Sequence, residues 1–455
     1  MNRKTIIALV VFIALGAVAL FAIRQPEKGD VVNDHPSPFA KLDPAQIDTL
    51  EVTKGGATTV IKNEGGKYKV TSPLSYPADE ASAKTAFEGL GKMKVTDLVT
   101  QQPGKHADFE VDAKAVHVVA KHGTQVLVDF LIGKSMGPGT AIRQPTSDDV
   151  WMATGLSRWS FDKSPTDWRD KSITTFPVAD VERLDVVTKD GARIAVKKTG
   201  TKQGSEDKWE VVDSSLKVDK LDDTVPNGMA TSLSIWKAND FADGMTAAAA
   251  GLDPPALTVT ATLKGGKKVV ALLGNGAKED EVYAKVPDAP QVYIVKKYNE
   301  ERVNKRPIQF RDKTMCDITE ANLAEVAVTR GENSYTLVND GKAWKVTKPA
   351  RVELEPTKAS PIAAAFKEWK ATAFAEQATP SSVGLVKPKA VIAVKARAKG
   401  APGCLVKVGD LTKDNLSYNL TSGKGNDVYV VPKWSVDRIL VKVDDLRKSG
   451  TIAKK

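Results

Sequence analysis

The residues with the most recognisable chemistry lie in the stretch DFLIGKSMGPGT, residues 129–140, which contains the GKS that ends a phosphate-binding P-loop. A complete P-loop needs another glycine five residues before the glycine of GKS, because the backbone N–H groups of a glycine-rich loop cradle the phosphates. Val128 occupies that position. The pattern therefore argues against a P-loop, and we expect neither a nucleotide partner nor any other cofactor.

Histidines and serines also lack a catalytic or metal-binding pattern. Besides His35 and His106, the chain has His117 and His122 on one expected strand, five residues apart, so they face opposite sides of a sheet. We interpret them as solvent-facing polar residues. The sequence GLSRWS from Gly155 is not the GxSxG elbow of a hydrolase nucleophile. We therefore assign no catalytic, cofactor-binding or metal-binding residue, and we expect no enzyme activity.

The chain has two cysteines, Cys316 and Cys404, and no CxxC motif. Two cysteines cannot build a disulfide framework, although they can form a single bridge. Sequence alone does not decide whether that bridge exists, because a bridge depends on the distance between the two Cα atoms, which spacing in the chain does not fix. Since Cys404 lies in an apolar strand, we interpret it as a buried core residue.

Composition is that of an ordinary globular protein of several domains. The chain has 455 residues, of which 42% are apolar and 27% charged, and its formal net charge is +10. At roughly 150 residues per domain, this length favours about three domains. Lys and Arg are spread along the chain without a run of five basic residues, so we expect no nucleic-acid partner.

Three segments repeat one pattern of strands and turns. They begin at Ile47, Val181 and Leu323, and each alternates apolar and polar residues over three short strands joined by glycine-containing turns. Each third strand carries an aromatic residue, and an apolar strand ends on a glycine 65 residues later. The aromatic and glycine pairs are Tyr68 and Gly133, Trp209 and Gly274, and Trp344 and Gly409.

A second spacing supports the repeat. The strand after each glycine has an aromatic residue, and an arginine follows it 18 residues later. These pairs are Trp151 and Arg169, Tyr293 and Arg311, and Tyr429 and Arg447. Two spacings that hold over three copies predict three homologous tandem modules, at residues 41–176, 177–316 and 317–455.

The repeat also helps to interpret individual residues. Lys134 of the GKS is replaced by Asn275 and Asp410 in the other copies, so only the glycine before it recurs. We interpret that glycine as meeting the ordinary need for positive φ in a turn after a strand. Asp170 and Asp312 follow the conserved-spacing arginines, whereas Lys448 stands in the third copy, which favours a structural ion pair or helix-end contact over catalysis. For the aromatic residues of the third strands we expect core or edge packing rather than a ligand platform.

Helical patterns lie between the strands of each module. Residues 79–93 and 360–374 have helical character, and in the second stretch Ile362, Ala365, Phe366 and Trp369 form one apolar face. Asp79, Asp222 and Ser360 are the expected N-caps. We expect a last helical segment over 158–170 and 296–312. Strand runs with helices set between them predict an α+β fold of mostly antiparallel sheet.

The N-terminus has the pattern of a membrane anchor. Residues 6–23 contain no charged or polar side chain, and 18 residues of helix span about 27 Å, close to the hydrocarbon core of a bilayer. We expect residues 1–5 to be a cytoplasmic stub, 6–23 a transmembrane anchor and 24–40 a linker, with the body exported because the N-terminal flank is basic. Cleavage as a signal peptide, with 17–19 as its candidate site, is the alternative.

Several of these features together resemble a known family. The first strands, the aromatic of the third strand, GLD at Gly251–Asp253, the strand ending on glycine and the closing RDK are similar to the bacterial domain-of-unknown-function 4340 family over nearly all of residues 41–450. The third copy has GLV from Gly384 and the first has DFEVD from Asp108. The resemblance implies one N-terminal membrane segment and genes beside ABC transporters, including gliding-motility-type systems. It carries over no catalytic residues.

We therefore expect a single-pass protein of the bacterial inner membrane with the bulk of the chain in the periplasm. Its expected role is that of a non-enzymatic accessory or scaffold protein, whose partner is an envelope protein such as an ABC transporter subunit. The alternative is an envelope glycan- or lipid-binding protein, or a hydrolase, that uses a cleft between modules. A deep cleft with convergent carboxylates would favour that alternative.

Overall fold

The computed structural model describes residues 37–200, 207–422, 425 and 427–448. The expected stub at 1–5, the expected anchor at 6–23 and most of the expected linker at 24–40 lie outside these residues. In the part of the chain that is described, no helix has the length and apolar character needed to cross a membrane. The chain divides into two compact units between Lys171 and Ser172, and we describe each by itself.

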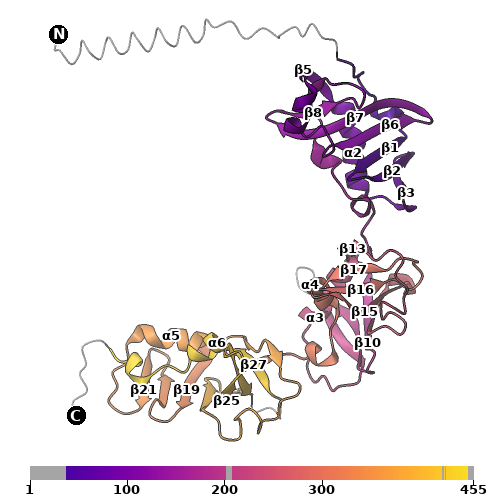
Figure 1. Cartoon of the computed structure of the whole chain (residues 1–455). Coiled ribbons are helices and arrows are strands. Elements are labelled where there is room, and N and C mark those ends of the chain that lie inside the picture. The colour runs from indigo at the N-terminus through magenta and orange to yellow at the C-terminus, as the bar shows by residue number, and fades with distance from the viewer. Residues whose placement is uncertain (1–36, 201–206, 423–424, 426, 449–455) are drawn as a thin grey trace, which may run out of the picture. The chain divides into compact units, whose positions relative to one another are not determined.

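The described residues form three large sheets, one in the first unit and two in the second (Figure 1). The first sheet contains β1 Thr49–Lys54, β2 Ala57–Glu64, β3 Lys67–Ser72, β4 Tyr76–Pro77, β5 Lys94–Thr100, β6 Val116–His122, β7 Gln125–Met136, β8 Gly139–Arg143 and β9 Val150–Thr154. The second contains β10 Val181–Thr188, β11 Arg193–Gly200, β12 Lys208–Ser214, β13 Asp240–Phe241, β14 Leu257–Leu263, β15 Lys268–Lys278, β16 Glu281–Lys285 and β17 Tyr293–Lys296. The third contains β19 Leu323–Thr329, β20 Tyr335–Asn339, β21 Trp344–Lys348, β23 Ala373–Phe374, β24 Ala390–Ala396, β25 Cys404–Leu411, β26 Ser417–Thr421 and β27 Tyr429–Pro432.

The three sheets share one strand order. The second sheet runs β12-β11-β10-β14-β15-β16-β17-β13, and the third runs β21-β20-β19-β24-β25-β26-β27-β23. The first runs β4-β3-β2-β1-β6-β7-β8-β9-β5, which is the same order with β4 added at one edge. The ladders of these sheets are antiparallel, so the expected class of mostly antiparallel sheet with a few helices is confirmed. The common order agrees with the repeat spacing, while the three module boundaries stay a prediction.

Alternation of apolar residues places the core on one face of each sheet. The equivalent central strands β6, β14 and β24 bury every second residue, with sequences VHVVAKH, LTVTATL and AVIAVKA. Two-residue turns hold the strands in register. Gly55 and Gly56 both have positive φ between Lys54 and Ala57, which pair with each other, so this hairpin turn needs two residues without a Cβ.

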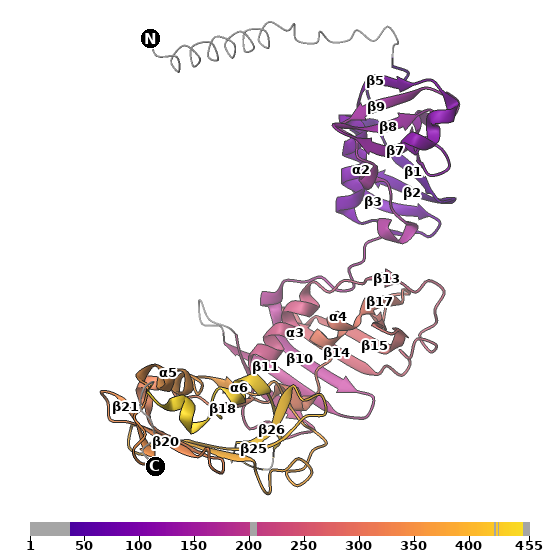
Figure 2. The same cartoon turned by 60° about the vertical axis from the view of Figure 1, so that its left-hand side comes forward.

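The helices pack on the sheets as short elements. They are α2 Glu80–Lys92, α3 Thr224–Ser234, α4 Lys297–Val303, α5 Pro356–Ala364 and α6 Lys433–Asp437. In the first unit α2 buries Ala83, Ala86, Phe87 and Leu90 in the same apolar cluster as the first sheet. In the second unit α3 lies beside β10 (Figure 2) and buries Met229 and Leu233.

Short 3-10 helices connect many of the elements. They are η1 Pro44–Gln46, η2 Pro103–Phe109, η3 Arg158–Ser160, η4 Pro165–Trp168, η5 Val178–Asp180, η6 Lys264–Gly266, η7 Pro307–Phe310, η8 Glu320–Asn322 and η9 Val443–Leu446. The last helical segment expected over 158–170 is broken into the turns η3 and η4, and the one expected over 296–312 consists of the short α-helix α4 followed by η7. Pro165 and Pro307 each start a new turn, because proline fits the first turn of a helix and not its interior.

The expected helix over 360–374 is wrong in its position. The helix α5 is Pro356–Ala364, and Glu368 then has a φ of 47°, which no right-handed helix allows. The following pair, β22 Trp369–Lys370, forms a small separate sheet with β18 Thr314–Cys316. The apolar residues that suggested one helical face are all buried, but on different elements.

Of the three expected caps, one is confirmed. Asp79 is the N-cap of α2, and its carboxylate accepts a hydrogen bond from Ser82 N–H at 2.8 Å. The prediction is one residue off at Asp222, because Asp223 is the N-cap of α3. It is wrong at Ser360, which lies inside α5, where its hydroxyl donates to Glu320. A proline at the first helical position begins α5, so a side-chain cap is less needed there.

The arginines of the repeat occupy one structural position. Arg169, Arg311 and Arg447 form isolated bridges with Ala78, Leu221 and Leu354, which lie just before α2, α3 and α5. The residue before each arginine is fully or almost fully buried: Trp168, Phe310 and Leu446. Each closing segment therefore seals the core against the chain that enters the helix, and this contact explains why its spacing recurs.

Candidate functional site

The GKS stretch is part of a strand. Gly133 to Ser135 lie within β7, which pairs with β6 on one side and β8 on the other. A phosphate-binding loop instead connects a strand to the N-terminus of a helix, where backbone N–H groups are free to face the phosphates. The ammonium of Lys134 lies 5.4 Å from the centre of the Phe109 ring. The stretch therefore lacks the strand-to-helix geometry of a phosphate-binding loop.

The repeated glycines are in equivalent strands, but the reason that we expected for them is wrong. Gly133, Gly274 and Gly409 lie inside β7, β15 and β25 rather than in turns, and their φ is not positive. A Cβ on them would overlap a backbone carbonyl oxygen, that of Phe109, Ala250 and Val383 respectively. Glycine is therefore required because a loop docks closely on the strand at this point.

The docked loops contain the GLD of the second copy and its counterparts. Their left-handed residues are Glu110 at φ 54°, Gly251 at φ 67° and Gly384 at φ 74°. The next residue of each loop is buried: Val111, Leu252 or Leu385. The GLD motif is thus explained by the fold, as a left-handed turn followed by an apolar anchor, and not by ligand binding.

The histidines described by the structure make ordinary surface contacts. The Nε2 of His117 lies 2.7 Å from Asp129 Oδ1, and Nδ1 of His122 lies 2.8 Å from the carbonyl oxygen of Gln46. His106 contacts the carbonyl oxygen of Asp148. Within the described residues, no three His, Cys, Asp or Glu side chains gather as metal ligands. His35 lies outside them.

The aromatic residues of the third strands are packing residues, as expected. Tyr68 lies against Phe87 of α2, with ring centres 5.1 Å apart. Trp209 is buried and donates its indole N–H to Asn227 at 2.7 Å. Trp344 is partly buried and donates to Glu320 at 3.2 Å. Each therefore joins the edge of a sheet to a neighbouring helix or turn.

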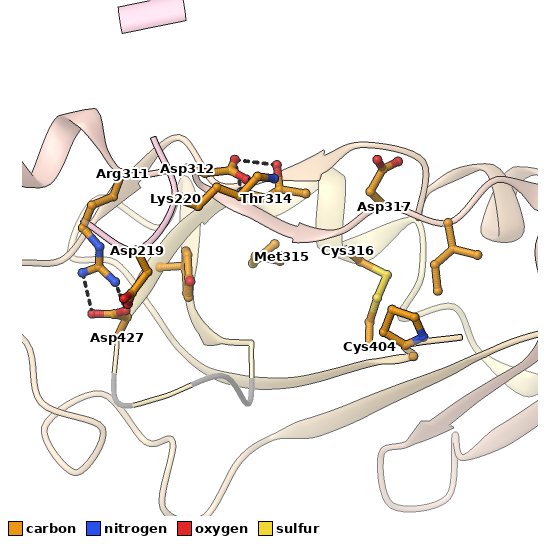
Figure 3. A pocket seen from close by; sticks show the side chains of 14 residues that line it. Asp219, Lys220, Arg311, Asp312, Thr314, Met315, Cys316, Asp317, Cys404 and Asp427 are labelled. Atoms are coloured by element: carbon orange, nitrogen blue, oxygen red, sulfur yellow. Dashed lines mark hydrogen bonds and ion pairs between the residues drawn. A yellow bond between two sulfur atoms is a disulfide. The ribbon is translucent and has the colours of Figure 1, made fainter. Parts of the chain in front are cut away.

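A hollow lined by charged side chains and by both cysteines lies between the second and third sheets, within the second unit. Its volume is about 390 Å³, and Figure 3 shows Arg311 and Asp427 toward one end and the disulfide of Cys316 and Cys404 toward the other. Asp219, Lys220 and Asp312 come from the second copy, whereas Asp427 and Cys404 come from the third. We call this hollow the junction.

An ion pair joins the two sides of the junction. Arg311 binds Asp427 through two parallel hydrogen bonds, one of them 2.9 Å long from Nη1 to Oδ1, and its guanidinium lies 4.8 Å from the centre of the Phe374 ring. The hydrogen bonds that Arg311 donates to Asp427 raise the pKa of Arg311. Two parallel bonds from a planar guanidinium also fix the orientation of its partner. The predicted structural ion pair at Arg311 is present, with a distant partner rather than its neighbour Asp312.

Asp312 has partners of its own. It pairs with Lys220 and accepts hydrogen bonds from the N–H and hydroxyl of Thr314, at 3.0 and 2.7 Å. Burial by itself would raise the pKa of Asp312, but the hydrogen bonds from Lys220 and Thr314 outweigh it and lower that pKa. Asp317 accepts the N–H of Glu368 at 3.0 Å. These charged side chains of the junction are therefore held by ion pairs and hydrogen bonds within the protein.

The two cysteines are bonded, which corrects the interpretation of Cys404 as a buried core residue. Cys316 of β18 and Cys404 of β25 form a disulfide with a Cα–Cα distance of 5.7 Å, and Cys404 is only partly buried. A protein disulfide is typical of an oxidising, extracytoplasmic compartment. Spacing in the sequence did not reveal this bond, because the β18–β22 pair that brings Cys316 close to β25 was not expected.

Comparison with known proteins assigns the chain to a family. The family described as Domain of unknown function (DUF4340) matches residues 68–255 and 227–388, which together span more than half of the chain. The chain therefore belongs to this family, as the resemblance in its sequence predicted. No curated protein and no solved structure matches it.

Proposed function

We propose that this chain is a non-enzymatic accessory or scaffold protein of the bacterial inner membrane, which works outside the cytoplasm with an ABC-type transport system. The observation that carries the proposal is the junction, where Arg311 of the second copy pairs with Asp427 of the third, and Lys220 pairs with Asp312 within the second copy. The first of these pairs fixes two copies of the repeat against each other, and both pairs occupy the charges with partners inside the protein. It suits a protein that presents surfaces to a partner.

The same residues weigh against the hydrolase alternative. Four aspartates line the junction: Asp219, Asp312, Asp317 and Asp427. Glycoside hydrolysis needs one carboxylic acid with a raised pKa to protonate the leaving group. Hydrogen bonding to Lys217 lowers the pKa of Asp219, and the bonds from Lys220 and Thr314 lower that of Asp312. Convergent carboxylates are therefore present, but the surroundings of Asp219 and Asp312 favour the charged form of these two over a proton donor.

The placement outside the cytoplasm is supported by two independent features. The disulfide of Cys316 and Cys404 favours an oxidising compartment. The apolar residues 6–23 have the length of a single membrane span with a basic N-terminal flank. The ABC-type partner rests on the family resemblance.

The two cysteines make the compartment directly testable, because the chain has no others. Intact cells are quenched with acid, and free thiols are labelled with a maleimide of large mass before and after reduction. An exported chain shifts in size only after reduction. The matched control is a variant without residues 6–23, which we expect to stay in the cytoplasm with both thiols free. Two free thiols in the complete chain would overturn the proposed location.

The partner is tested by affinity purification of the complete chain from gently solubilised membranes, followed by mass spectrometry. We expect subunits of an ABC transporter to co-purify, and to be lost with the variant without residues 6–23. Recovery of the chain from carbonate-washed membranes without any transporter subunit would reject the partner while retaining the anchor. Hydrolysis of envelope glycan by the purified chain would reject the non-enzymatic role.

A further inference from the structure

Three large aromatic side chains stand out on the surface of the described residues. Trp159 is 81% exposed, Tyr298 62% and Trp434 69%. Each lies in the first helical turn after the last long strand of its sheet, in η3, α4 and α6 respectively. The three copies of the repeat thus expose one large ring each, at corresponding places in the fold.

The residues around these rings repeat as a six-residue pattern that the internal comparison reveals. The copies are RWSFDK at 158–163, KYNEER at 297–302 and KWSVDR at 433–438. Each has a cation, an aromatic ring, a small polar residue, a buried residue, an acid and a second cation. We call this pattern the aromatic hexad. Its signal in the sequence is the cation on either side of the ring, at one residue before and four residues after.

Packing explains some positions of the aromatic hexad. The fourth residue, which is Phe161, Glu300 or Val436, is buried in every copy. The acid pairs with the first cation in two copies, as Arg158 with Asp162 and Lys433 with Asp437. These contacts hold the turn in place. They leave the exposed ring unexplained, because a polar residue at that position would cost the fold little.

The copies have diverged elsewhere, which makes the constancy of the exposed ring informative. The left-handed residue of the docked loop is Glu110 in one copy and Gly251 in another. The buried position of the aromatic hexad changes from Phe161 to Glu300. A large exposed ring that recurs while buried positions change indicates a contact with something outside the chain, because substitutions at exposed positions otherwise cost the fold little.

We propose that the aromatic hexads are contact points for an anionic membrane surface. Trp and Tyr combine an apolar ring with a polar N–H or O–H, and they gather where lipid meets water. Two cations flank each ring in the sequence, and a Lys or Arg near an anionic surface contributes about 1 kcal/mol. Part of this charge is balanced within the chain, because Arg158 pairs with Asp162 and Lys433 with Asp437. The guanidinium of Arg438 lies 5.6 Å from the centre of the Trp434 ring. The formal charge of +10 over the chain adds to this attraction.

The inference rests on the proposed function, in which residues 6–23 hold the chain at the bilayer. An anchored body meets the lipid surface at a high effective concentration, so a contact that is weak by itself can form. A free body with the same contacts would bind weakly. Each aromatic hexad is therefore a separate contact that the anchored protein can make with the membrane.

Tryptophan fluorescence provides a direct test, because residues 1–36 contain no tryptophan. Of the eight tryptophans, five are buried, so Trp159 and Trp434 are the ones most accessible to a quencher in lipid. The complete chain is reconstituted into vesicles of anionic lipid with brominated acyl chains, and into zwitterionic vesicles of the same bromination. We expect quenching in the anionic vesicles, weakened by added salt and lost in the variant with Trp159→Ser and Trp434→Ser.

Control variants separate the aromatic hexads from general exposure. Ile235 and Val386 are 67% and 70% exposed and lie outside the pattern, so Ile235→Ser and Val386→Ser should leave the quenching unchanged. Near-UV circular dichroism checks that the variants fold. Equal quenching in the double tryptophan variant would overturn the inference, as would an unquenched chain that carbonate washing leaves in the membrane. If isolated envelope glycan or a purified protein binds the wild-type rings and lipid does not, the lipid assignment is wrong. Loss of the chain from washed membranes would instead reject the anchor.

Discussion

The first and second copies of the repeat dock the same loop on the same strand with different residues in the left-handed position. In the second, a Cβ on Gly251 would lie within 2.6 Å of the side-chain nitrogen of Asn275. In the first, the corresponding residue is Glu110, and the counterpart of Asn275 is Lys134. The long side chain of Lys134 turns to the ring of Phe109, which leaves room for Glu110 to keep its side chain and pair with Arg158.

The third copy follows the second. Asp410 takes the place of Asn275, and a Cβ on Gly384 would lie 2.6 Å from its carboxylate oxygen. A short polar side chain directly after the strand glycine therefore lies against the left-handed residue of the docked loop, and that residue must be glycine. A long side chain at the same position leaves room for a residue with a Cβ. This coupling gives Lys134 a structural reason to be a lysine. The resemblance to GKS follows from the docked loop of the first copy, and no phosphate is needed to explain it.

The disulfide is attached to β25 of the third copy, and the corresponding strand of the first copy has no such bond. Removing the disulfide should have the largest effect on the free energy of unfolding. Cys404 begins β25, the strand that also carries Gly409, while β7 has no cysteine. The bond closes a loop with a sequence separation of 88 residues. A loop of this size predicts a loss of about 4 kcal/mol in the free energy of unfolding when both cysteines become serine. Hydrogen exchange of the complete chain should show faster opening of the third sheet and unchanged protection in the first. Equal protection of the third sheet in wild type and variant would contradict the prediction.

Much of the sheet architecture was predictable from the sequence. The strand β14 alternates strictly over seven residues, which is difficult to satisfy in a helix, and the buried residues of β6 and β24 also fall at every second position. The two fixed spacings then revealed the copies, because each copy places its buried aromatic, docked glycine and sealing arginine at the same points of one strand order. The position of Gly133 was correctly predicted to recur in the other copies.

Features that depend on contacts between distant segments were not predictable. The close approach behind Gly274 involves the carbonyl oxygen of Ala250, and spacing alone cannot distinguish close approach from a turn. The apolar pattern over 360–374 looked helical because buried residues of α5 and β22 happen to fall at helical intervals. The pair Arg311 and Asp427 joins residues that are far apart in the chain, so their contact needed the structure. The aromatic hexad is the opposite case, because comparison of the copies could have found it.

The docked glycine of the second copy gives a matched test within one strand. A Cβ on Gly274 would overlap the carbonyl oxygen of Ala250, whereas the atoms nearest to a Cβ on Gly276 are 3.7 and 3.8 Å away. We expect Gly274→Ala to lower the free energy of unfolding by about 2–3 kcal/mol, because the loop must move off β15 to admit the methyl group. Gly276→Ala should change it by less than about 1 kcal/mol. Urea unfolding of both variants checks the pair, and similar losses would show that the loop is not docked as closely as described.

The smallest expected effect is the coupling free energy between the left-handed residue of the docked loop and the residue directly after the strand glycine. Gly251→Ala should lower the free energy of unfolding by about 1–2 kcal/mol, since a left-handed conformation disfavours any Cβ. Part of the loss should be recovered in the Asn275→Ala background, where the side-chain atoms that a Cβ would meet are gone. We expect a coupling free energy of about 0.5–1 kcal/mol from this double-mutant cycle. Glu110→Ala is the matched change in the first copy and should cost less than Gly251→Ala, because the position already accommodates a Cβ beside Lys134. A cycle without coupling, together with equal costs at Glu110 and Gly251, would mean that the residue after the strand glycine does not determine which residue the loop can hold.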